Sequence, residues 1–569
     1  MRERALIPRS LGRLRVLMPA ESPVNVLQAL ATRFLPVLFE DDDLLAVAKP
    51  AGVDASADRP GAAPGVLEIL AASRRTDESL SVVRRLTRYE SGVLLLAKRP
   101  ASAKQLKADL RGRKIEQEVV AVCLGSFQPR RRVVTASRGR AEGARGRVAG
   151  RRVPDPAAGR EVTHVEHLQS GPKRCMIRFR ARAETTHVLR AALRGAGLRL
   201  LGDNVHERSV RRQDPAALCL HLASVAFFHP VQRRKVLIRA TPPAEFREAL
   251  RGLPLVERHL QGSLLRRSSL LLDESTDGYR LLTGPAEGLS SLVAERLGRA
   301  VVLSVSADDA ADADLARRVA HWYRRHLDID VVYAKVPFGE RGDDAAPRMP
   351  LVLAGEPGPA ELVVREHGLR FLVRVDEKAG LGLFFDHRDN RRRVRELAAG
   401  RDVLNLFAYT CGFSVAAAVG KCRQVVSVDI SPKALVWGQR NFEINELDAA
   451  SHEFVRADAR DYLERAVRRQ QQFDLVLVDP PTFSHGRHAG RAFSLVADLP
   501  ALMARAVEVL RPGGVLMVAT NYRKLSRARF RQLIRQGVAP RPHTMDMPPL
   551  PPDFAVDPDH AKTAFVTLI

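Results

Sequence analysis

Cysteine is scarce in this sequence and never occurs as a close pair. The 569 residues include five cysteines, Cys123, Cys175, Cys219, Cys411 and Cys422, with no CxxC spacing among them. Structural zinc sites and disulfide frameworks both need clustered cysteines, so neither is expected and no metal site is predicted. Scattered thiols are typical of a reducing compartment, which indicates a cytoplasmic protein.

Long apolar runs are also missing. No stretch of about eighteen or more apolar residues occurs, so no membrane-spanning helix is expected. The N-terminus, MRERALIPRSLGRLRVLMPAE, is rich in arginine but lacks the apolar segment and small-residue cleavage site of a secretory signal. An amphipathic organelle transit peptide is the alternative interpretation of these residues.

Acidic residues are outnumbered, and the deficit lies almost entirely in the first half of the chain. The protein has 91 Lys and Arg against 65 Asp and Glu, a net charge of +26. Residues 1–260 hold 48 basic and 26 acidic residues, a net +22, whereas residues 261–569 carry +4. A general bias toward arginine would spread the excess along the whole chain. The asymmetry therefore indicates a polyanion-binding module, with RNA as the expected partner, joined to a near-neutral one.

The chain is too long for a single hydrophobic core, and its patterns divide it into four segments. Residues 1–36 predict a poorly ordered arm or a short helix. Residues 37–260 alternate strand-length apolar runs with polar turns, and the nine arginines of 130–152 predict a loop or basic hairpin. Residues 266–355 predict a small α+β unit. Strands and helices alternate over 360–569, which favours an α/β doubly wound parallel sheet.

The most specific pattern begins at VLNLFAYTCGFSVAAAVG, residues 403–420. An apolar strand passes through a glycine-containing turn into a helix of small residues, as in the first unit of a nucleotide-binding sheet. The next strand ends in Asp429, 24 residues after Asn405, where a carboxylate can accept hydrogen bonds from ribose hydroxyls. The following strand ends at Asp458. Either acid alone would suit a helix N-cap, but their recurrence at consecutive strand ends favours a ligand site.

A fourth strand of this unit, FDLVLV, ends in Asp479, Pro480 and Pro481, with Phe483 close behind. Two prolines fix an extended, rigid turn at the carboxyl edge of the sheet. Backbone carbonyls and the Asp479 carboxylate can accept amino or imino hydrogens of a nucleobase, and Phe483 can stack on its face. These four residues are the predicted catalytic residues.

Together these motifs resemble class I S-adenosylmethionine-dependent methyltransferases, and within them the enzymes that modify cytosine C5 or guanine N7 of large-subunit ribosomal RNA. The resemblance covers residues 360–569 and reaches back over GYRLLTGPAEGLSSLVAERLGRAVVLSV in the central unit. It implies a Rossmann-like α/β domain with S-adenosylmethionine as cofactor. From the residues alone, Arg388 would equally suit a solvated helix start. By the resemblance, the cofactor pocket would be lined by Phe384, Asp386, Arg388, Asn405, Phe407, Tyr409, Gly412, Asp429, Asp458 and Asp479.

Cysteine is missing at the position where one acceptor base would need it. Methylation of cytosine C5 requires a thiolate that adds to C6, and in the cytosine enzymes of this family a cysteine follows the last core strand. The corresponding stretch here, VLMVATNYRKLS, has Thr520 and Asn521 instead. Guanine N7 has its own lone pair, so transfer to it needs only positioning. The sequence therefore favours guanine N7, with nucleobase exocyclic amines as an alternative.

The first 260 residues resemble RNA pseudouridine synthases of the large-ribosomal-subunit type, which implies an α+β domain. The family's motif His-Arg-Leu-Asp-Arg corresponds to RRLTR at 84–88, so Thr87 stands where the catalytic aspartate would be. Val119 replaces the tyrosine that packs on uracil, and Thr185 replaces the arginine that pairs with the aspartate. The pieces that carry the resemblance are VLFEDDDLLAVAKPAGV, VRRLTRYESGVLLLAKRP, ETTHVLRAALRGAGLRLLGDNVH and CLHLASVAFFHP.

Loss of these three groups predicts an isomerase site that is inactive but still binds RNA. A displaced acid at Glu90 or Asp109 is the alternative. Arginines would contact phosphates and supply affinity rather than base specificity. The predicted RNA-binding residues are Arg84, Arg85, Arg88, Arg130, Arg131 and Arg132.

The whole sequence thus predicts an S-adenosylmethionine-dependent RNA base methyltransferase with a degenerate pseudouridine-synthase-like domain. An active pseudouridine synthase and a non-catalytic, RNA-binding ribosome assembly factor are the alternatives.

Overall fold

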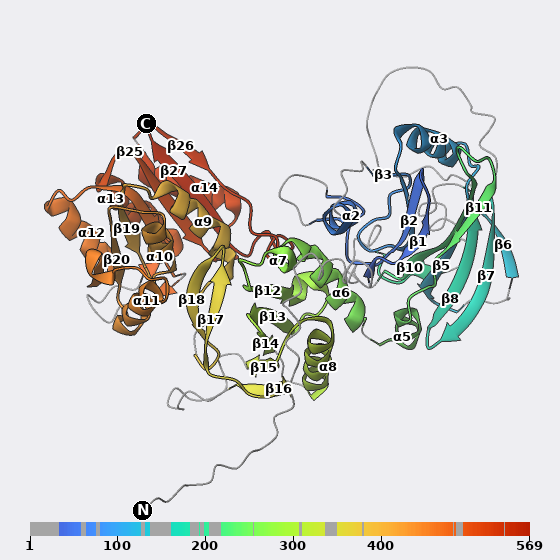
Figure 1. Ribbon diagram of the computed structural model, residues 1–569, viewed down its shortest axis with the longest axis horizontal. Coiled ribbons are helices and arrows are strands. Elements are labelled where there is room, and N and C mark those ends of the chain that lie inside the picture. Colours follow the sequence, from blue (N-terminus) through green and yellow to red (C-terminus); the bar gives the residue numbers. More distant parts are fainter. Residues whose placement is uncertain are drawn as a thin grey trace, which may run out of the picture.

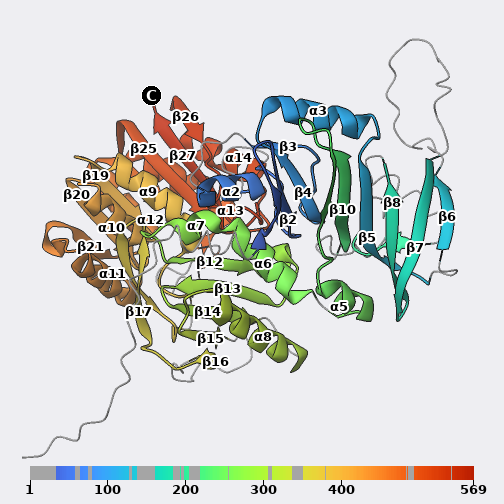
Figure 2. The ribbon, with the colours of Figure 1, turned by 45° about the vertical axis from the view of Figure 1, so that its right-hand side comes forward.

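The computed structural model describes residues 34–57, 64–74, 80–126, 131–136, 161–182, 193, 198–203, 218–253, 255–305, 310–335, 350–377, 380–481, 483–484, 493–539 and 541–569. Most of the predicted N-terminal arm and of the 130–152 run, together with Thr185, lie outside these residues. Figures 1 and 2 show three units in chain order: a strand-rich unit coloured blue to green, a central unit coloured green to yellow, and a C-terminal unit coloured yellow to red.

The N-terminal unit is built on one large mixed sheet. Its main path is β1-β2-β4-β10-β5-β8-β7-β6, with β3, β9 and β11 paired to strands of that path. The apolar sequence SGVLLLA of β4 is buried along its whole length, as expected for a strand covered on both faces. The strands are β1 (Val37–Glu40), β2 (Leu44–Lys49), β3 (Ser81–Val82), β4 (Ser91–Ala97), β5 (Glu116–Leu124), β6 (Arg131–Ala136), β7 (Glu161–Gly171), β8 (Arg174–Ala181), β9 (Arg199–Leu200), β10 (Leu220–Phe228) and β11 (Lys235–Arg239), and the helices are α2 (Val66–Arg74), α3 (Pro100–Arg111) and α5 (Glu245–Arg251).

The central unit is a sheet of order β12-β13-β14-β15-β16 that packs against helix α8 (Ala310–His326). This helix buries Ala316, Val319, Ala320 and Tyr323, the spacing that places apolar side chains on one helical face. Because β14 and β15 are parallel, α8 serves as the crossover between them. The other elements are α6 (Val256–Arg266), α7 (Ser268–Leu272), β12 (Gly278–Thr283), the 3₁₀ helix η2 (Gly284–Glu287), β13 (Leu292–Leu297), β14 (Ala300–Val305), β15 (Val331–Lys335) and β16 (Leu351–Gly355).

The C-terminal unit confirms the predicted doubly wound sheet. Its strand order is β21-β20-β19-β22-β25-β27-β26, so the chain starts in the middle, builds outward to β21, and then crosses back to β22. β19 is parallel to both of its neighbours, and β27 is antiparallel to β25. The reversal of strand order on the two sides of β19 creates a crevice at the carboxyl ends of the strands, where ligands bind in such folds.

Its elements follow in chain order. They are the hairpin β17 (Glu361–Glu366) and β18 (Leu369–Arg374), η3 (Phe385–His387), α9 (Arg388–Leu397), β19 (Asp402–Leu406), α10 (Gly412–Val419), β20 (Gln424–Asp429), α11 (Pro432–Ile444), η4 (Ala449–Ser451), β21 (Glu453–Arg456), α12 (Ala459–Arg468), β22 (Phe473–Val478), β23 (Phe483–Ser484), β24 (Phe493–Ser494), α13 (Leu495–Glu508), β25 (Leu510–Thr520), α14 (Arg527–Val538), β26 (His543–Asp546) and β27 (Lys562–Leu568). None of the helices in the described parts of the chain is long and apolar enough to cross a bilayer.

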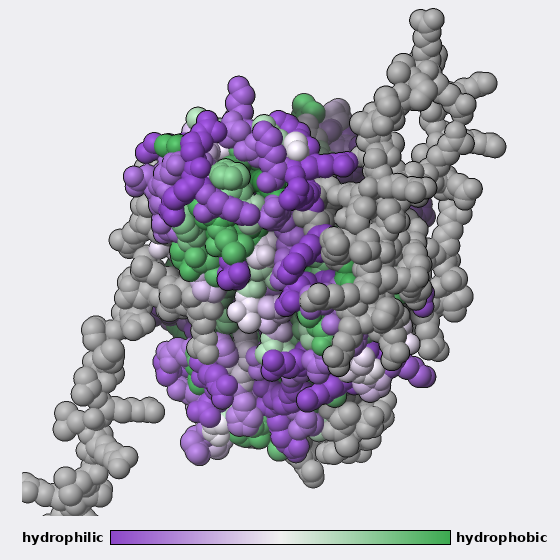
Figure 3. Space-filling view, turned by 90° about the vertical axis from the view of Figure 1, so that its right-hand side faces the viewer, coloured by the Kyte–Doolittle hydropathy of each residue, from purple (hydrophilic) through white to green (hydrophobic). Residues whose placement is uncertain are grey.

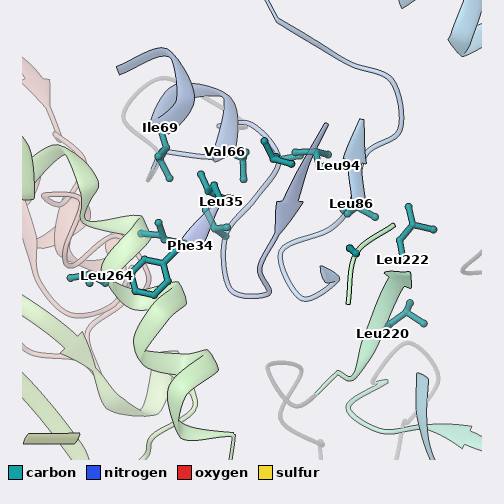
Figure 4. Close-up of a cluster of buried hydrophobic side chains, with 14 of the residues drawn as sticks. Phe34, Leu35, Val66, Ile69, Leu86, Leu94, Leu220, Leu222 and Leu264 are labelled. Carbon is teal, nitrogen blue, oxygen red and sulfur yellow. The ribbon is translucent and has the colours of Figure 1, made fainter. Parts of the chain in front are cut away.

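The N-terminal and central units share one hydrophobic core. Figure 4 shows Phe34, from the end of the predicted arm, lying against the helix that carries Leu264. The Phe34 ring also stacks on Trp322 of α8, with ring centroids 6.3 Å apart. Gly52 and Gly262 meet so closely that a Cβ on Gly262 would lie 2.8 Å from the Gly52 Cα. The two units are therefore packed together rather than tethered by a free linker.

A buried network of charged groups joins the central and C-terminal units. Arg267 donates to both carboxylate oxygens of Glu287, at 2.8 and 2.9 Å, and to the backbone carbonyl of Asp553 at 3.0 Å. Arg388 forms a second ion pair with the Asp553 carboxylate, and Arg266 a third with Glu287. All five side chains are less than 8% exposed. Charges removed from water in this way need close partners, and each has one here.

Candidate active site

The loop after β19 lies at the crevice and has an unusual backbone. Phe407, Tyr409 and Cys411 have φ values of 59°, 48° and 61°, a left-handed conformation that costs energy for any residue with a Cβ. The backbone N–H of Tyr409 donates to Asp429 Oδ2 at 2.8 Å. The loop is thereby fixed against the acid at the end of the neighbouring strand. These left-handed residues give the loop its shape at the carboxyl edge of the sheet.

Asp429 and Asp458 have different local roles. Asp429 Oδ1 also accepts the N–H of Ser431 at 2.8 Å, so each oxygen of this half-buried carboxylate holds one backbone donor and has acceptor capacity left. Asp458 is the N-cap of α12 and pairs with Arg460, which lowers the pKa of Asp458. The contacts of Asp458 are therefore those of a helix N-cap. A contact between Asp458 and a cofactor stays a prediction.

The segment before α9 packs against the loop that follows β19. Phe384 is 47% exposed, and its ring lies 5.5 Å from that of Tyr409. Thr410 Oγ1 donates to the Gly382 carbonyl at 2.5 Å. A Cβ on Gly412 would meet only ordinary contacts, the nearest 3.4 Å away on Leu383. Phe384 and Tyr409, both predicted cofactor contacts, thus lie side by side.

His387 links this segment to the end of β22. Its Nε2 lies 3.2 Å from Asp479 Oδ2, and its Nδ1 faces the Asn390 amide at 3.0 Å. The His387 ring packs edge-on against Phe413 with centroids 5.4 Å apart. Burial alone lowers the pKa of His387, but the carboxylates of Asp479 and Asp386 outweigh it and the net pKa is raised. His387 thereby contacts Asp479, whose side chain is 26% exposed.

Three other predicted cofactor residues are engaged inside the protein. The buried Asp386 carboxylate lies 3.5 Å from His560. Arg388 pairs with Asp553, as described above. Asn405 donates to Ser414 Oγ at 2.8 Å beneath the loop. These contacts show how the three side chains support the crevice, and direct contact with a cofactor stays a prediction for each.

The two prolines after Asp479 form the end of the turn predicted at this edge. Pro480 is buried and Pro481 is exposed. Phe483 lies in β23, where it is opposite Ser494 of β24. Its side chain is outside the described residues, so stacking of Phe483 on a base stays a prediction.

Neither cysteine of the C-terminal unit has the properties of a nucleophile. Burial raises the pKa of Cys411 to about 12 and that of Cys422 to about 11. Thiolates are the reactive form, so both side chains are inert near neutral pH. Thr520 at the end of β25 is buried, and its Oγ1 accepts the N–H of Tyr522 at 3.1 Å.

The loop that resembles a pseudouridine synthase active site is held by internal contacts. Thr87 is exposed, and its backbone N–H donates to Glu90 Oε2 at 2.8 Å. Arg88 forms an ion pair with Asp54 at 2.7 Å. Lys49 is buried beneath the loop and donates to the Glu90 carbonyl at 2.6 Å, and burial lowers the pKa of Lys49 to about 7. Arg84 is half-buried and Arg85 is exposed, while Val119 is buried in the core.

Sequence reasoning passed over three residues that the structure brings into these sites. His387 was not distinguished from its neighbours because its partner Asp479 lies 92 positions away. Asp553, the partner of Arg388, sits in a proline-rich stretch with no regular pattern. Asp54 lies in the KPAGVD segment, where only its pairing with Arg88 distinguishes it.

One group of side chains has the composition of a metal site. Asp41, Asp43 and His229 place ligand-type atoms within 4.8 Å of one another. His229 Nδ1 accepts the backbone N–H groups of Val231 and Gln232, so in the neutral ring the proton is on Nε2, 3.0 Å from Asp41 Oδ2. These two atoms lie at ion-pair distance, but neither has a hydrogen-bond partner among the described residues.

Comparison with known proteins agrees with the fold. Residues 341–567 match the family described as S-adenosylmethionine-dependent methyltransferases, and residues 43–220 match the family described as RNA pseudouridylate synthases. Ribosomal RNA large subunit methyltransferase I from Yersinia pseudotuberculosis serotype O:1b (strain IP 31758) and from Yersinia pestis are each 32% identical over 261 residues. That alignment covers 46% of this chain and 65% of each relative.

A solved structure gives the same result for the C-terminal part. The crystal structure of SMU.776 complexed with SAH is 25% identical, with a TM-score of 0.50, and the match covers 61% of this chain and 88% of that chain. The chain therefore joins an N-terminal domain of the pseudouridine synthase family to a C-terminal S-adenosylmethionine-dependent methyltransferase domain.

Proposed function

We propose that this protein transfers the methyl group of S-adenosylmethionine to a base of large-subunit ribosomal RNA, with guanine N7 as the acceptor atom. The observation that carries the proposal is the arrangement at the strand-order reversal. The strained loop 407–411, Asp429 and Asp479 all lie at the carboxyl ends of adjoining strands, where the fold binds ligands. The curated relatives named above act on large-subunit ribosomal RNA by name, which supports the same class of substrate.

The residues at the crevice suit this cofactor. Asp429 keeps acceptor capacity for ribose hydroxyls, and the neighbouring Phe384 and Tyr409 rings offer an apolar wall for the adenine or the methionine chain. S-adenosylmethionine supplies an electrophilic methyl group when bound. The chain's part is to align the acceptor atom with that methyl group, since proximity and orientation alone supply much of the rate for a nucleophile with its own lone pair.

Guanine N7 fits the nucleophiles that the chain offers. Cytosine C5 would need a thiolate at the acceptor, and the raised pKa values of Cys411 and Cys422 argue against either as its source. Carboxylate and carbonyl oxygens after β22 are acceptors suited to the N1–H and N2 amino hydrogens of guanine. A guanine held by that edge would present N7 on its opposite side.

We propose further that the N-terminal domain binds RNA without isomerising uridine. Thr87 has a hydroxyl where the family has a carboxylate, and a hydroxyl needs an adjacent base to act as a nucleophile. Glu90, the acid of the same loop, accepts the backbone N–H of Thr87. Asp109, the other candidate for a displaced acid, lies on α3 beside Gln105 and Lys114 instead. Asp54 is committed to Arg88.

Purified protein incubated with ribosomal RNA and methyl-labelled S-adenosylmethionine tests the proposal. Label should enter RNA, and Asp479→Ala should abolish transfer. Nucleoside analysis should find the label on guanine N7. Label on cytosine C5 would overturn the acceptor atom alone.

Two other outcomes separate the alternatives. Release of tritium from RNA labelled at uridine C5 would show an active pseudouridine synthase and contradict the idle N-terminal site. RNA binding with neither methyl transfer nor S-adenosylmethionine binding would instead indicate an assembly factor.

A further inference from the structure

The hairpin of β10 and β11 exposes apolar side chains at one end of the N-terminal sheet. Phe228, Val231 and Leu237 are 61%, 59% and 49% exposed. Among side chains that the structure describes, the other strongly exposed phenylalanine is Phe384, which lies in the candidate methyltransferase site. Figure 3 looks onto the side of the molecule at the right of Figure 1, where hydrophobic surface lies as patches within a largely hydrophilic surround. An exposed aromatic ring beside polar neighbours is typical of a binding surface.

Cations surround this ring from two elements. The turn between β10 and β11 and the turn between α3 and β5 come together here, since Phe228 is paired with Lys235 and Ala226 with Glu116. Asp109 pairs with Lys114 and Glu116 with Lys235, and Asp41 lies 3.0 Å from His229 of the β10–β11 turn. The exposed cations of the two turns still outnumber these carboxylates, so the local charge is positive. The exposed cations are Arg111, Arg113, Lys114, Arg233, Arg234 and Lys235.

The surface is hollowed beside the ring. A cavity of about 290 Å³ is lined by Phe228, Arg233, Lys114 and Asp109, with Gln105 as a further polar group. A wider groove of about 1190 Å³ begins at Arg113 and continues along β8 and β11. Phe228 therefore stands at the rim of a small cavity that has cations on its wall. That combination provides a π face for a base and positive charge for the phosphate attached to it.

We propose that this surface, defined by Phe228, Lys114, Arg113 and Arg233, binds single-stranded RNA by stacking one base on Phe228. The proposal rests on the RNA substrate proposed above, and it assigns binding to residues away from the loop at 84–90. Single strands fit better than duplexes because only an unpaired base offers its face to a side chain. The flanking cations would hold the neighbouring phosphates and give no base specificity.

Fluorescence anisotropy of the full-length protein with a labelled single-stranded RNA of about twelve nucleotides tests the proposal. Phe228→Ala should weaken binding about tenfold, whereas Phe228→Tyr, which keeps the ring, should bind like the wild type. Leu351→Ala is the matched control, since Leu351 is 64% exposed on β16 of the central unit. It should leave the affinity unchanged.

The contribution of the cations is tested separately, by the salt dependence of the binding affinity. Lys114→Ala and Arg233→Ala should each reduce the slope of log affinity against log salt by about 0.7, the value for one lost phosphate contact on a single strand. Arg468→Ala, an exposed arginine at the end of α12, should not change the slope.

Several results would overturn this assignment. Equal binding by Phe228→Ala and wild type, or equal weakening by Phe228→Ala and Phe228→Tyr, would contradict base stacking. The same loss on a duplex of the same sequence would contradict single-strand selectivity. If the wild type transfers methyl groups and Phe228→Ala binds RNA equally well, the assignment of this surface is contradicted. The proposed function would then still stand.

Discussion

His387 connects the segment before α9 to the proposed catalytic carboxylate, and its titration has a predictable consequence. The side chains that face it with charge are Asp479, Asp386 and Arg391, of which the two acids raise the pKa of His387 above 6.5. The imidazolium form is therefore favoured below the raised pKa and is lost as pH rises through it. If the charged ring holds Asp479 in place, methyl transfer should decline on the alkaline side of that pKa.

The variant His387→Gln tests this role. Gln can still donate to Asp479 but does not titrate, so kcat/KM should fall by about tenfold and the alkaline decline should disappear. An unchanged pH profile in His387→Gln would show that the pair is merely structural.

The cysteines of the C-terminal domain give a second prediction for single residues. Because burial raises the pKa of Cys422 to about 11, it has no role as a thiolate, and Cys422→Ser should transfer methyl groups at the wild-type rate. Asp479→Ala, assayed beside it, gives the level of an inactive site. A large loss in Cys422→Ser would restore cytosine C5 as the acceptor.

At the level of elements, the turn at 380–382 and the loop at 407–411 shape the crevice by close packing. Gly382 has a φ of +100°, and a Cβ there would lie 2.4 Å from the Trp437 ring. Gly382→Ala should therefore lower the free energy of unfolding by about 1–3 kcal/mol and weaken S-adenosylhomocysteine binding in calorimetry.

The matched control is Gly368→Ala in the turn between β17 and β18. Gly368 has a φ of +80° but no atom within 4 Å of a built Cβ, so it shares the backbone strain and lacks the clash. It should leave cofactor binding unchanged. Equal effects of the two substitutions would mean that backbone strain alone accounts for the loss.

The elements also show which features the sequence could predict. Strand β19 and the acids Asp429 and Asp479 follow from local pattern, because apolar runs that end in acids mark the carboxyl edge of a parallel sheet. The pairing of Arg388 with Asp553 could not be predicted, since 165 positions separate them and no periodicity links them. Likewise, Asp458 follows the same pattern as Asp429, yet only the structure distinguishes the N-cap from the acid that holds the loop.

On the scale of the whole molecule, buried charges hold the three units in one arrangement. Arg266 reaches both Glu287 and the Gly52 carbonyl, so the network extends from the methyltransferase domain to the N-terminal domain. Glu287→Gln leaves Arg266 and Arg267 buried with less compensation, and should lower the free energy of unfolding in urea by about 3–5 kcal/mol.

Acid unfolding of the wild type should show the stabilising effect of the same carboxylate, Glu287. Burial by itself raises the pKa of Glu287, but Arg267 and Arg266 outweigh it and lower the pKa to about 2. The stabilisation is therefore complete above the ordinary value of 4.5 and is lost as pH falls from 4.5 toward 2.

The control for Glu287→Gln is Glu295→Gln, which removes a partner of Arg280 nearer the surface. It should lower the free energy of unfolding by about 1 kcal/mol or less. Equal losses from the two variants would contradict a dominant role for the buried network.

The most direct measurement of the whole proposal is nucleoside mass spectrometry of ribosomal RNA treated with the purified protein and S-adenosylmethionine. A methyltransferase with an idle isomerase domain should raise methylguanosine and leave pseudouridine unchanged. With Asp479 replaced by Ala, neither nucleoside should increase. A rise in pseudouridine with no new methylated base would contradict it, because the chemistry would then belong to the N-terminal domain.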